Sequence, residues 1–512
     1  MSKNKLTIDL DSLVAKSYET KHKNDTSKVR TTKGKVETEN LIQNTKSSLK
    51  LKPRYTHNDS FSTTTNTKIT SSFKEFPWFI KLFSFLLFIA LMIIIPIYTI
   101  KGTNLIAGLL KDFNIDISGH SVVALIAAEP KLKTDGYGRT NILLVGIDSR
   151  RKNLKDSRGG LQNTDTIILA SYDHNKHALY LISFPRDTWV KYPNTYYYNK
   201  INAVYAYGER INPGHGLDYL KSLIEKLSGL KIQYYAMVNF DGFKKIIDKL
   251  GGVDVYVERS FVDYSYPKGH GYMTVKFNKG WNHFSGERAL QYARSRKAAG
   301  PEGSDFARAR RQQKIIQAVI DKFKKKGISD PKFVYNILKV ISNNIILSRI
   351  TPLDVQAGLE LLKKGKPKMY SLVLEPSIGN YSLIGRGNTT LYTLVPKAGI
   401  DNWTFVKRFI RDWMCAPEMV TKNPTIYVYN ANDPNYYADY RTITRRYFYY
   451  KIVPGGYWGK TFTGKVITSP NNKFTNAAKC ISSNTFLKYK EFSDDNIPKK
   501  IKGKDLVIIL GK

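Results

Sequence analysis

Short apolar runs alternate with helical patterns through the middle of the chain. Helical periodicity is clear at Leu217–Leu227 and at Phe240–Leu250, where the pair Gly251 and Gly252 marks the helix end. The turn-forming run Asp173–Lys176 predicts a hairpin between two of the predicted strands. These strands are rich in β-branched and large apolar residues, and they are NILLVGI (141–147), TIILASY (166–172) and ALYLISF (178–184).

The pattern continues in the same way towards residue 413. A strand is predicted at Val253–Val257, and helices are predicted at about 285–297, 305–325, 331–345 and 352–364. Together these elements predict an α/β domain over 139–413, in which helices flank a central mixed β-sheet. The last part of the chain, 424–512, holds the strand IYVYNA, the helical pattern YADYRTITRRYFYY and the strand DLVIILGK. We expect it to form a small α/β C-terminal domain.

The chain before residue 139 shows a different pattern. Residues 1–76 are rich in Lys, Thr, Ser and Asn without sustained periodicity, so we expect a disordered basic tail. The uncharged run LFSFLLFIALMIIIPIYTI (82–100) is long enough to cross a bilayer and predicts a transmembrane helix within 77–100, with a buried core helix as the alternative. A slight excess of lysine before this run favours a single-pass cell-membrane protein with a cytoplasmic N-terminus. The spacer (101–138) and both folded domains would then lie outside the membrane.

Composition adds a strong positive charge. The 512 residues include 81 Lys and Arg against 42 Asp and Glu, which gives a formal net charge of +39. Such a charge suits nucleic acid, anionic lipid headgroups or an anionic polymer outside the cell, as well as simple solubility. The two cysteines, Cys415 and Cys480, lack zinc-type spacing, and they could form a disulfide if this part of the chain lies outside the cytoplasm. No motif of a serine hydrolase, a zinc protease or a Walker-type phosphate loop occurs.

Arginine is concentrated in one stretch, although lysine is the commoner base in the rest of the chain. A planar guanidinium can grip phosphate oxygens two at a time, whereas lysine offers a point charge. This local choice of arginine predicts a phosphate site; the alternative is a basic solvated face. The six arginines are Arg288, Arg294, Arg296, Arg308, Arg310 and Arg311.

Helical spacing divides this stretch. Asp305 is a plausible N-cap for the second helix, and Arg308, Arg311 and Gln312 share one face of it. Residues 294 and 296, both arginine, are two positions apart and can share a target only if one lies at a frayed helix end.

Two aspartates flank the first pair of predicted strands. Asp148 follows the first strand, and Asp165 precedes the second. If these strands pair antiparallel, the two carboxylates meet, and Mg²⁺ is typically held by one or two carboxylates with phosphate oxygens and water. The alternative is a pair of turn-forming aspartates. Arg186 and Asp187 follow the third strand, where they reach the same site only if the strand order allows it; otherwise they form a surface ion pair.

A set of motifs in a fixed order resembles the LytR-CpsA-Psr family. The motifs are TNILLVGIDSR, NTDTIILASYD, LISFPRDTWV, NKINAVYAYG, VNFDGFKKIIDKLGGVDVYV, LQYARSR and SDFARARRQQ, between about 139 and 325. The tail from TIYVYNA to DLVIILGK is similar to a small C-terminal domain often attached to these proteins. A slightly long loop between Arg296 and Asp305, and Ala307 in place of the usual glycine, depart from the family pattern.

The resemblance implies a membrane-anchored phosphotransferase of the bacterial cell envelope. Members move a glycopolymer, such as teichoic acid, from an undecaprenyl diphosphate carrier to peptidoglycan, with Mg²⁺ (or Mn²⁺) on the diphosphate and the lipid chain in an apolar tunnel. Cleavage of the prenyl diphosphate alone is a related activity. No nucleic-acid partner is expected. The resemblance implies catalytic or substrate-binding roles for Arg186, Asp187, Lys200, Arg294, Arg296, Arg308, Arg311 and Gln312, and metal-binding roles for Asp148 and Asp165.

Two other functions remain as alternatives at this stage. The charge permits a membrane-bound transcriptional regulator, but the predicted span would place the arginine stretch on the far side of the membrane from DNA. A wall-binding protein with a degenerate site is the other, and the complete set of aspartates and arginines argues against it. Arg288 and Arg310 have no role in either interpretation and are expected at the solvated surface.

Overall fold

The structure, a computed structural model, describes residues 129–148, 163–326, 331–376, 382–388, 390–459, 462–492 and 496–512. The predicted basic tail (1–76), the predicted transmembrane helix (77–100) and most of the predicted spacer (101–138) lie outside these ranges. Within the ranges, no helix is both long enough and apolar enough to cross a membrane.

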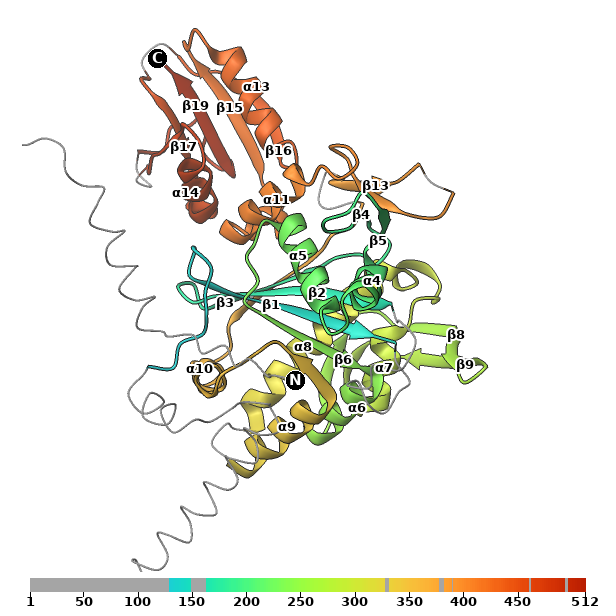
Figure 1. The fold of residues 1–512 in the computed structure, drawn as a ribbon. Coiled ribbons are helices and arrows are strands. Elements are labelled where there is room, and N and C mark those ends of the chain that lie inside the picture. The colour runs from blue at the N-terminus through green and yellow to red at the C-terminus, as the bar shows by residue number, and fades with distance from the viewer. Residues whose placement is uncertain are drawn as a thin grey trace, which may run out of the picture. The chain divides into compact units, whose positions relative to one another are not determined.

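A six-stranded mixed sheet forms the centre of the first folded domain, in the order β11-β6-β1-β2-β3-β12 (Figure 1). β1 pairs antiparallel with β2 and parallel with β6, while β3 pairs antiparallel with β2 and parallel with β12. The predicted central mixed sheet is therefore confirmed. The strands are β1 (Arg139–Ile147), β2 (Thr164–Asp173), β3 (Ala178–Ser183), β6 (Tyr234–Asn239), β11 (Ile345–Leu347) and β12 (Lys368–Val373).

The predicted hairpin joins β2 to β3. The Asp173 carboxylate accepts hydrogen bonds from the backbone N–H groups of Asn175 and Lys176, at 3.0 and 2.9 Å. An aspartate that bonds the backbone two and three positions ahead stabilises a tight turn. The two strands then pair from Asp173 opposite Ala178 onwards.

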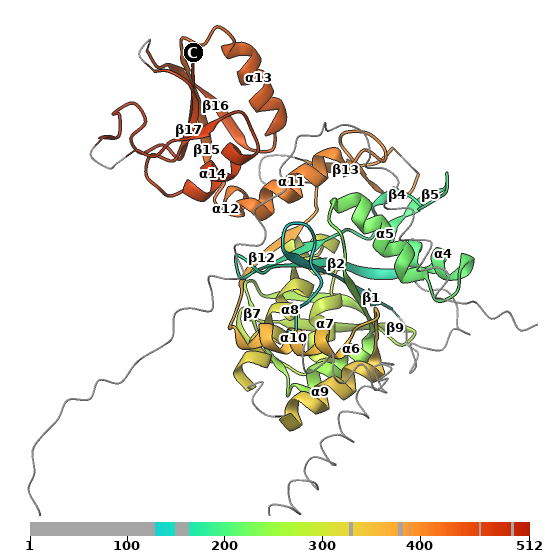
Figure 2. The same ribbon diagram turned by 60° about the vertical axis from the view of Figure 1, so that its left-hand side comes forward.

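Helices cover both faces of this sheet, which makes three layers (Figure 2). On one face, Leu143 and Val145 of β1 pack in a cluster with α5 and α11. On the other face, Ile168 of β2 packs with Ile142, Leu144 and Ile316, the last of which belongs to α8. The alternation along β1 is what a strand buried on both faces requires. The helices are α4 (Val204–Ile211), α5 (Gly216–Ser228), α6 (Phe240–Lys249), α7 (Gly286–Arg294), α8 (Asp305–Lys326), α9 (Pro331–Asn344), α10 (Pro352–Lys363), α11 (Thr404–Cys415) and α12 (Glu418–Thr421).

Short strand pairs and turns complete the domain. One group of them packs against α7 and α8 around Phe261, Phe277 and Tyr292. The pairs are β4 (Trp189–Lys191) with β5 (Tyr198–Lys200), β7 (Val253–Val257) with β10 (Gly280–Phe284), β8 (Phe261–Lys268) with β9 (Gly271–Phe277), and β13 (Ile384–Arg386) with β14 (Leu394–Pro396). Two 3-10 turns are η1 (Ile201–Ala203) and η2 (Gly300–Glu302).

The C-terminal part forms a second sheet of five strands, in the order β16-β15-β19-β17-β18. Val428 and Ile508 are fully buried in it, as the apolar strands IYVYNA and DLVIILGK predict. The elements are β15 (Thr425–Ala431), α13 (Tyr436–Arg446), β16 (Lys451–Tyr457), β17 (Lys465–Thr468), α14 (Thr475–Ser483), β18 (Lys488–Tyr489) and β19 (Leu506–Gly511).

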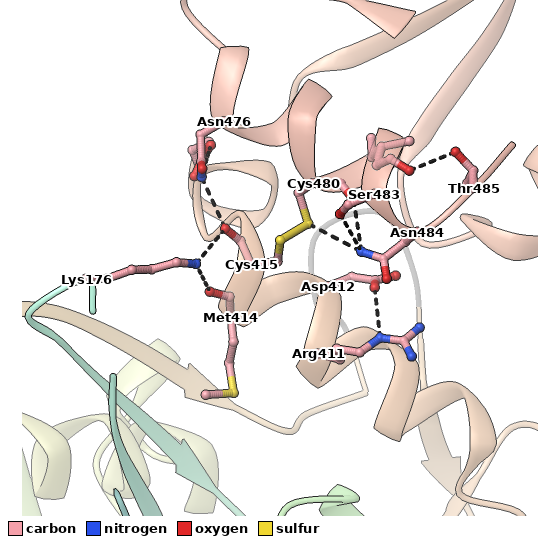
Figure 3. Close-up of a disulfide and its surroundings, with 12 residues drawn as sticks. Lys176, Arg411, Asp412, Met414, Cys415, Asn476, Cys480, Ser483, Asn484 and Thr485 are labelled. Carbon is pink, nitrogen blue, oxygen red and sulfur yellow. Dashed lines mark hydrogen bonds and ion pairs between the residues drawn. A yellow bond between two sulfur atoms is a disulfide. The ribbon is translucent and has the colours of Figure 1, made fainter. Parts of the chain in front are cut away.

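A disulfide joins Cys415, the last residue of α11, to Cys480 of α14 (Figure 3). Their Cα atoms lie 6.0 Å apart across 65 positions of sequence. Asn476 Nδ2 donates a hydrogen bond to the carbonyl of Cys415 at 3.1 Å, and Lys176 Nζ donates to the carbonyl of Met414 at 3.2 Å. The disulfide that the sequence allowed but did not determine is thus present in the structure.

Candidate functional site

The two predicted metal-binding aspartates lie at the same end of the β1–β2 pair. The strands are antiparallel, with Ile147 opposite Thr164 and an irregular register at this end. Asp148 follows β1 directly, and Asp165 is the second residue of β2. The antiparallel pairing on which the sequence argument depended is therefore confirmed.

Arg186 connects three carboxylates beside this strand end. Its Nη1 lies 3.1 Å from Asp165 Oδ1, and its Nε lies 3.1 Å from Asp305 Oδ2 and 3.5 Å from Asp187 Oδ2. Burial by itself would lower the pKa of Arg186, but Asp305, Asp165 and Asp187 outweigh it, so the pKa lies above its ordinary value. Arg186 and Asp187 thus reach the edge of the sheet where Asp165 lies.

Asp187 also binds Lys200. Lys200 Nζ lies 2.5 Å from Asp187 Oδ1. Lys200 ends β5, and Trp189, which begins β4, is paired opposite it. The short β4–β5 hairpin therefore folds Lys200 back next to Asp187, which lies two positions before the first residue of β4.

The first turns of α8 supply Asp305 and Arg308. The side chain of Arg308 is 8% exposed; its Nη1 lies 3.3 Å from Asp305 Oδ1, and its Nη2 donates to the Asp165 carbonyl at 3.5 Å. Burial lowers the pKa of Arg308, and the positive charges of Arg186 and Arg296 act in the same direction, against the two aspartates. Within the described residues, Arg308 Nε is buried and has no hydrogen-bond acceptor. A buried donor without an acceptor is costly, so this atom suits an anionic ligand.

Arg294 and Arg296 lie on either side of a helix end. Arg294 is the last residue of α7, and its Nη2 lies 3.4 Å from Asp148 Oδ2. Its guanidinium carbon lies 4.0 Å from the centre of the Phe240 ring. Arg296 follows beyond the helix, where it is half-buried and close enough to Arg308 to affect its pKa. Because α7 ends between the two residues, Arg294 and Arg296 are not both held in helical geometry and can point towards the same ligand.

Arg311 has a different environment from the one the sequence predicts for it. Its side chain is 2% exposed, and its Nη1 pairs with Glu302 Oε2 at 2.7 Å. Its Nε donates to the carbonyl of Tyr292 at 3.0 Å, and its Nη2 donates to the carbonyl of Ser295. All three nitrogens thus bind protein groups, and the side chain ties α8 to the end of α7. These contacts give Arg311 a structural role, and the diphosphate contact that the resemblance implies for it stays a prediction.

The remaining arginines of the stretch lie away from the aspartates. Arg310 is 47% exposed and pairs with Glu375 at 3.0 Å, as expected for a surface residue. Arg288 is half-buried, with its guanidinium carbon 4.0 Å from the centre of the Phe277 ring, so it packs more closely than predicted.

An apolar cavity of about 220 Å³ lies on the sheet face covered by α8. It ends at Arg294, which belongs to the charged cluster of Asp148, Asp165, Arg186, Asp187, Lys200, Arg294, Arg296, Asp305 and Arg308. Leu144, Ile168, Phe243 and other apolar residues line it, and Arg294 and Gln312 supply its polar groups. Gln312 Nε2 donates to the carbonyl of Ala293 at 3.3 Å. The charged cluster and the apolar cavity thus share Arg294 as a boundary.

A second apolar cavity, of about 410 Å³, lies further along the same sheet face. Its lining includes Ile142 of β1, two positions from Leu144 of the first cavity, and Phe323 and Ile337 of α8 and α9. Residues two apart on a strand point to the same face. The space between the sheet and α8 is therefore apolar from the charged cluster towards the start of β1.

The donor set fits a hard divalent cation that binds together with phosphate. Asp148 and Asp165 offer two carboxylates at one strand end, which Mg²⁺ or Mn²⁺ takes when phosphate oxygens and water supply the other ligands. Among the described residues, no group of three or more His, Cys, Asp or Glu side chains could hold a metal ion by itself. A cation at this place would therefore need oxygens of a bound diphosphate as well.

The part played by Asp305 does not follow from the sequence. The sequence favours this residue as the N-cap of α8, but the Ser304 hydroxyl accepts the N-cap hydrogen bond from the Ala307 backbone N–H at 3.1 Å. Asp305 is the first residue of the helix, which leaves its carboxylate to bind both Arg186 and Arg308. The sequence signal for this was Ser304, which directly precedes Asp305, because serine and aspartate both cap helices well.

Comparison with known proteins agrees with this arrangement. The model of the LytR_cpsA_psr family matches residues 113–388, which is more than half of the chain. The chain belongs to the LytR_cpsA_psr family. The match includes both aspartates, the arginine stretch and the whole six-stranded sheet, so the resemblance seen in the motifs is confirmed.

Two relatives and one solved structure show how far the similarity extends. The chain is 35% identical over 182 residues to the polyisoprenyl-teichoic acid–peptidoglycan teichoic acid transferase TagU of Bacillus mycoides (strain KBAB4), which covers 36% of this chain and 52% of TagU. It is 32% identical over 242 residues to the regulatory protein MsrR of Staphylococcus aureus (strain COL), covering 46% of this chain and 64% of MsrR. The matched regions thus span about half to two thirds of these relatives. The crystal structure of B. subtilis TagV is 27% identical, with a TM-score of 0.40 over 54% of this chain and 98% of TagV.

Proposed function

We propose that this chain is a membrane-anchored enzyme with extracytoplasmic domains, which transfers a glycopolymer from a polyprenyl-diphosphate carrier to peptidoglycan. One observation carries the proposal: an apolar cavity between sheet and helix ends at a cluster of arginines and aspartates, with Arg294 shared between the two. A ligand that fits both parts has a long apolar chain and an anionic head. The name of TagU, which describes a polyisoprenyl-teichoic acid donor and a peptidoglycan acceptor, supports this ligand class.

The charged cluster would hold the diphosphate. Arg308 Nε, buried without an acceptor among the described residues, is the donor most in need of a phosphate oxygen. Arg186 and Arg296 lie close enough to Arg308 to affect its pKa, and Arg294 pairs with Asp148 at the same strand end. Lys200, paired with Asp187, adds a fifth positive charge. Guanidinium groups in fixed positions neutralise the charge that develops when a phosphoryl group is transferred. We assign Gln312 to the boundary between the diphosphate and the apolar chain, because it lines the cavity there.

Asp148 and Asp165 would hold the Mg²⁺ ion together with diphosphate oxygens. When bound, the ion supplies charge neutralisation on the diphosphate and makes its phosphorus more open to attack. The ion pairs of Asp148 with Arg294 and of Asp165 with Arg186 keep each carboxylate next to a phosphate-binding arginine. Cation and anion sites would therefore be arranged by the same contacts.

The reaction balances without a further reagent. The oxygen of an acceptor hydroxyl forms a bond to the phosphorus that carries the glycopolymer, and the bond from that phosphorus to the bridging oxygen breaks. Prenyl monophosphate leaves with the bridging oxygen, and the hydroxyl proton passes to a carboxylate of the cluster. Asp148, Asp165 and Asp187 are the candidates for this base. With water as the acceptor, the same step would cleave the carrier diphosphate.

The full-length protein tests this proposal in detergent with Mg²⁺, an undecaprenyl-diphosphate-linked glycopolymer and peptidoglycan. We expect release of prenyl monophosphate and appearance of glycopolymer phosphate in the peptidoglycan fraction. Arg308→Ala should reduce transfer by at least ~100-fold, which is the usual cost of removing one preorganised donor. Arg310→Ala is the matched control, because Arg310 lies in the same helix but pairs with Glu375 at the surface. Equal activity of the two variants, or no release by the wild type, would overturn the proposal.

A further inference from the structure

The β8–β9 hairpin presents an aromatic and basic face beside the charged cluster, and the family assignment gives it no role. We infer that this face binds the acceptor, an anionic glycan strand of the peptidoglycan type, and positions its hydroxyl at the cluster. The inference rests on the proposed function and adds the surface that recognises the second substrate.

A buried aspartate attaches the hairpin to the arginine stretch. Asp263 of β8 is 1% exposed, and its Oδ2 accepts hydrogen bonds from the backbone N–H groups of Arg296 and Lys297, at 3.1 and 3.2 Å. Its Oδ1 accepts a third bond, from the Ser265 backbone N–H at 3.0 Å. A buried carboxylate with three backbone donors is held firmly. The hairpin and the loop that carries Arg296 therefore form one structural unit.

The inner side of the hairpin reaches the cluster itself. Tyr266 is 3% exposed, and its hydroxyl lies 3.5 Å from Arg294 Nη1. The guanidinium carbon of Arg294 lies 5.5 Å from the centre of the Tyr266 ring. Only the hairpin itself thus separates a molecule bound to its outer side from Arg294, which we assign to the diphosphate.

The outer side carries two exposed tyrosines. The register shifts between Asp263 and Tyr266, and Tyr264, which lies within this shift, is 72% exposed. Tyr272 on β9 is 68% exposed, and Lys297 Nζ lies 5.3 Å from the centre of its ring. Large aromatic side chains usually bury part of their surface, so two solvent-exposed rings on one short hairpin indicate a binding partner. Sugar rings offer apolar C–H faces that stack on such tyrosines.

The charges of the hairpin select an anionic partner. From Phe261 to Gly280 the basic residues are Lys268, Lys276 and Lys279, whereas the only acidic residue is the buried Asp263. An acceptor strand with carboxylates complements this charge. A membrane surface is the competing partner, but a segment that enters the interface carries large apolar residues where it penetrates. The turn here is Lys268-Gly269-His270-Gly271, which favours the glycan.

The test uses the full-length protein in detergent and the double variant Tyr264→Ala/Tyr272→Ala. Tyr437→Ala is the matched control, because Tyr437 is 80% exposed on α13. Cosedimentation with peptidoglycan sacculi stripped of teichoic acid should show a Kd on the order of tenfold higher for the double variant, from the loss of two aromatic contacts. The control should keep the wild-type Kd. Equal Kd values for all three proteins would overturn the inference.

Kinetics separate this inference from the proposed function. In the transfer reaction, the double variant should show a higher KM for the acceptor, with kcat and the acceptor-independent cleavage of the carrier close to wild type. If carrier cleavage falls as much as transfer, the tyrosines act on the charged cluster and the inference is wrong. If the wild type transfers nothing but the tyrosines still govern binding to sacculi, the proposed function fails and the glycan surface stands.

A fluorophore tests the competing partner directly. The variant Thr274→Cys places a label between the two tyrosines, on a residue that is exposed in β9. We expect its emission to respond to soluble peptidoglycan fragments and not to reconstitution into phosphatidylglycerol vesicles. A shift on reconstitution without a response to the fragments would assign the face to lipid and overturn the inference.

Discussion

Arg186 Nη1 lies 3.1 Å from Asp165 Oδ1, and this pair connects the proposed phosphate site to the proposed metal site. Arg186 lies in the segment that follows β3, and Asp165 lies at the start of β2, 21 positions earlier. Their side chains are 22% and 33% exposed, so a ligand can reach both. A phosphate bound by Arg186 therefore lies next to a carboxylate that can share a cation with it.

Removal of the metal should abolish transfer, and Asp165→Asn should reproduce much of that loss. An amide is a weaker cation ligand than a carboxylate, so we expect activity to fall by roughly 100-fold or more. Titration calorimetry of Mg²⁺ in the presence of a prenyl diphosphate gives a second readout, in which the variant should bind the ion more weakly. Asp401→Asn is the control, because Asp401 pairs with Lys226 at the surface of another part of the domain. Unchanged Mg²⁺ affinity in Asp165→Asn would remove Asp165 from the metal site.

Filling the apolar cavity should discriminate between carriers of different length. Ala236 lines the cavity, and Ala236→Phe would place a ring in a space of about 220 Å³. We expect KM for a long prenyl diphosphate to rise by about tenfold or more, because the variant removes apolar surface that the chain would bury. A carrier with a very short prenyl chain should be turned over as by the wild type. The same effect on both carriers would show that the substitution disturbs the charged cluster instead.

Two adjacent arginines of α8 should differ sharply in their effect on stability. Arg311→Ala leaves Glu302 without its partner and removes the donors to two buried carbonyl groups, so we expect the free energy of unfolding to fall by about 3–5 kcal/mol. Arg310→Ala removes an exposed ion pair and should change it by less than about 1 kcal/mol. Thermal unfolding of the two variants measures this difference. Similar Tm values would contradict the structural role of Arg311.

The disulfide should stabilise the C-terminal part of the protein. The bond between Cys415 and Cys480 closes a loop of 65 positions, which restricts the unfolded chain. We expect Cys480→Ser to lower the free energy of unfolding by about 2–4 kcal/mol, while a reducing agent lowers Tm of the wild type and leaves the variant unchanged. A free-thiol count on the denatured, unreduced protein is the direct check. Two titratable thiols per chain would show that the bond does not form.

Local sequence predicted the regular elements well. The β2–β3 hairpin follows from Asp173 and the turn residues after it, and the end of α6 follows from Gly251 and Gly252, both of which adopt a positive φ. These features depend on the preferences of a few neighbouring residues, so they can be read without the fold. The family could also be recognised, because its motifs keep their order along the chain.

The sequence by itself determined the strands, most helices and the presence of an arginine-rich stretch. Tertiary structure decided which of those arginines lie beside the aspartates. Arg308 and Arg311 share a helix face in projection, yet the turn at η2 places Glu302 against Arg311, while Asp305 and Asp165 lie against Arg308. Helical spacing fixes the direction of a side chain to within a face, but the partners on that face come from distant segments. The sequence did not determine the apolar cavity or the cysteine pair for the same reason: both depend on contacts between residues far apart in the chain.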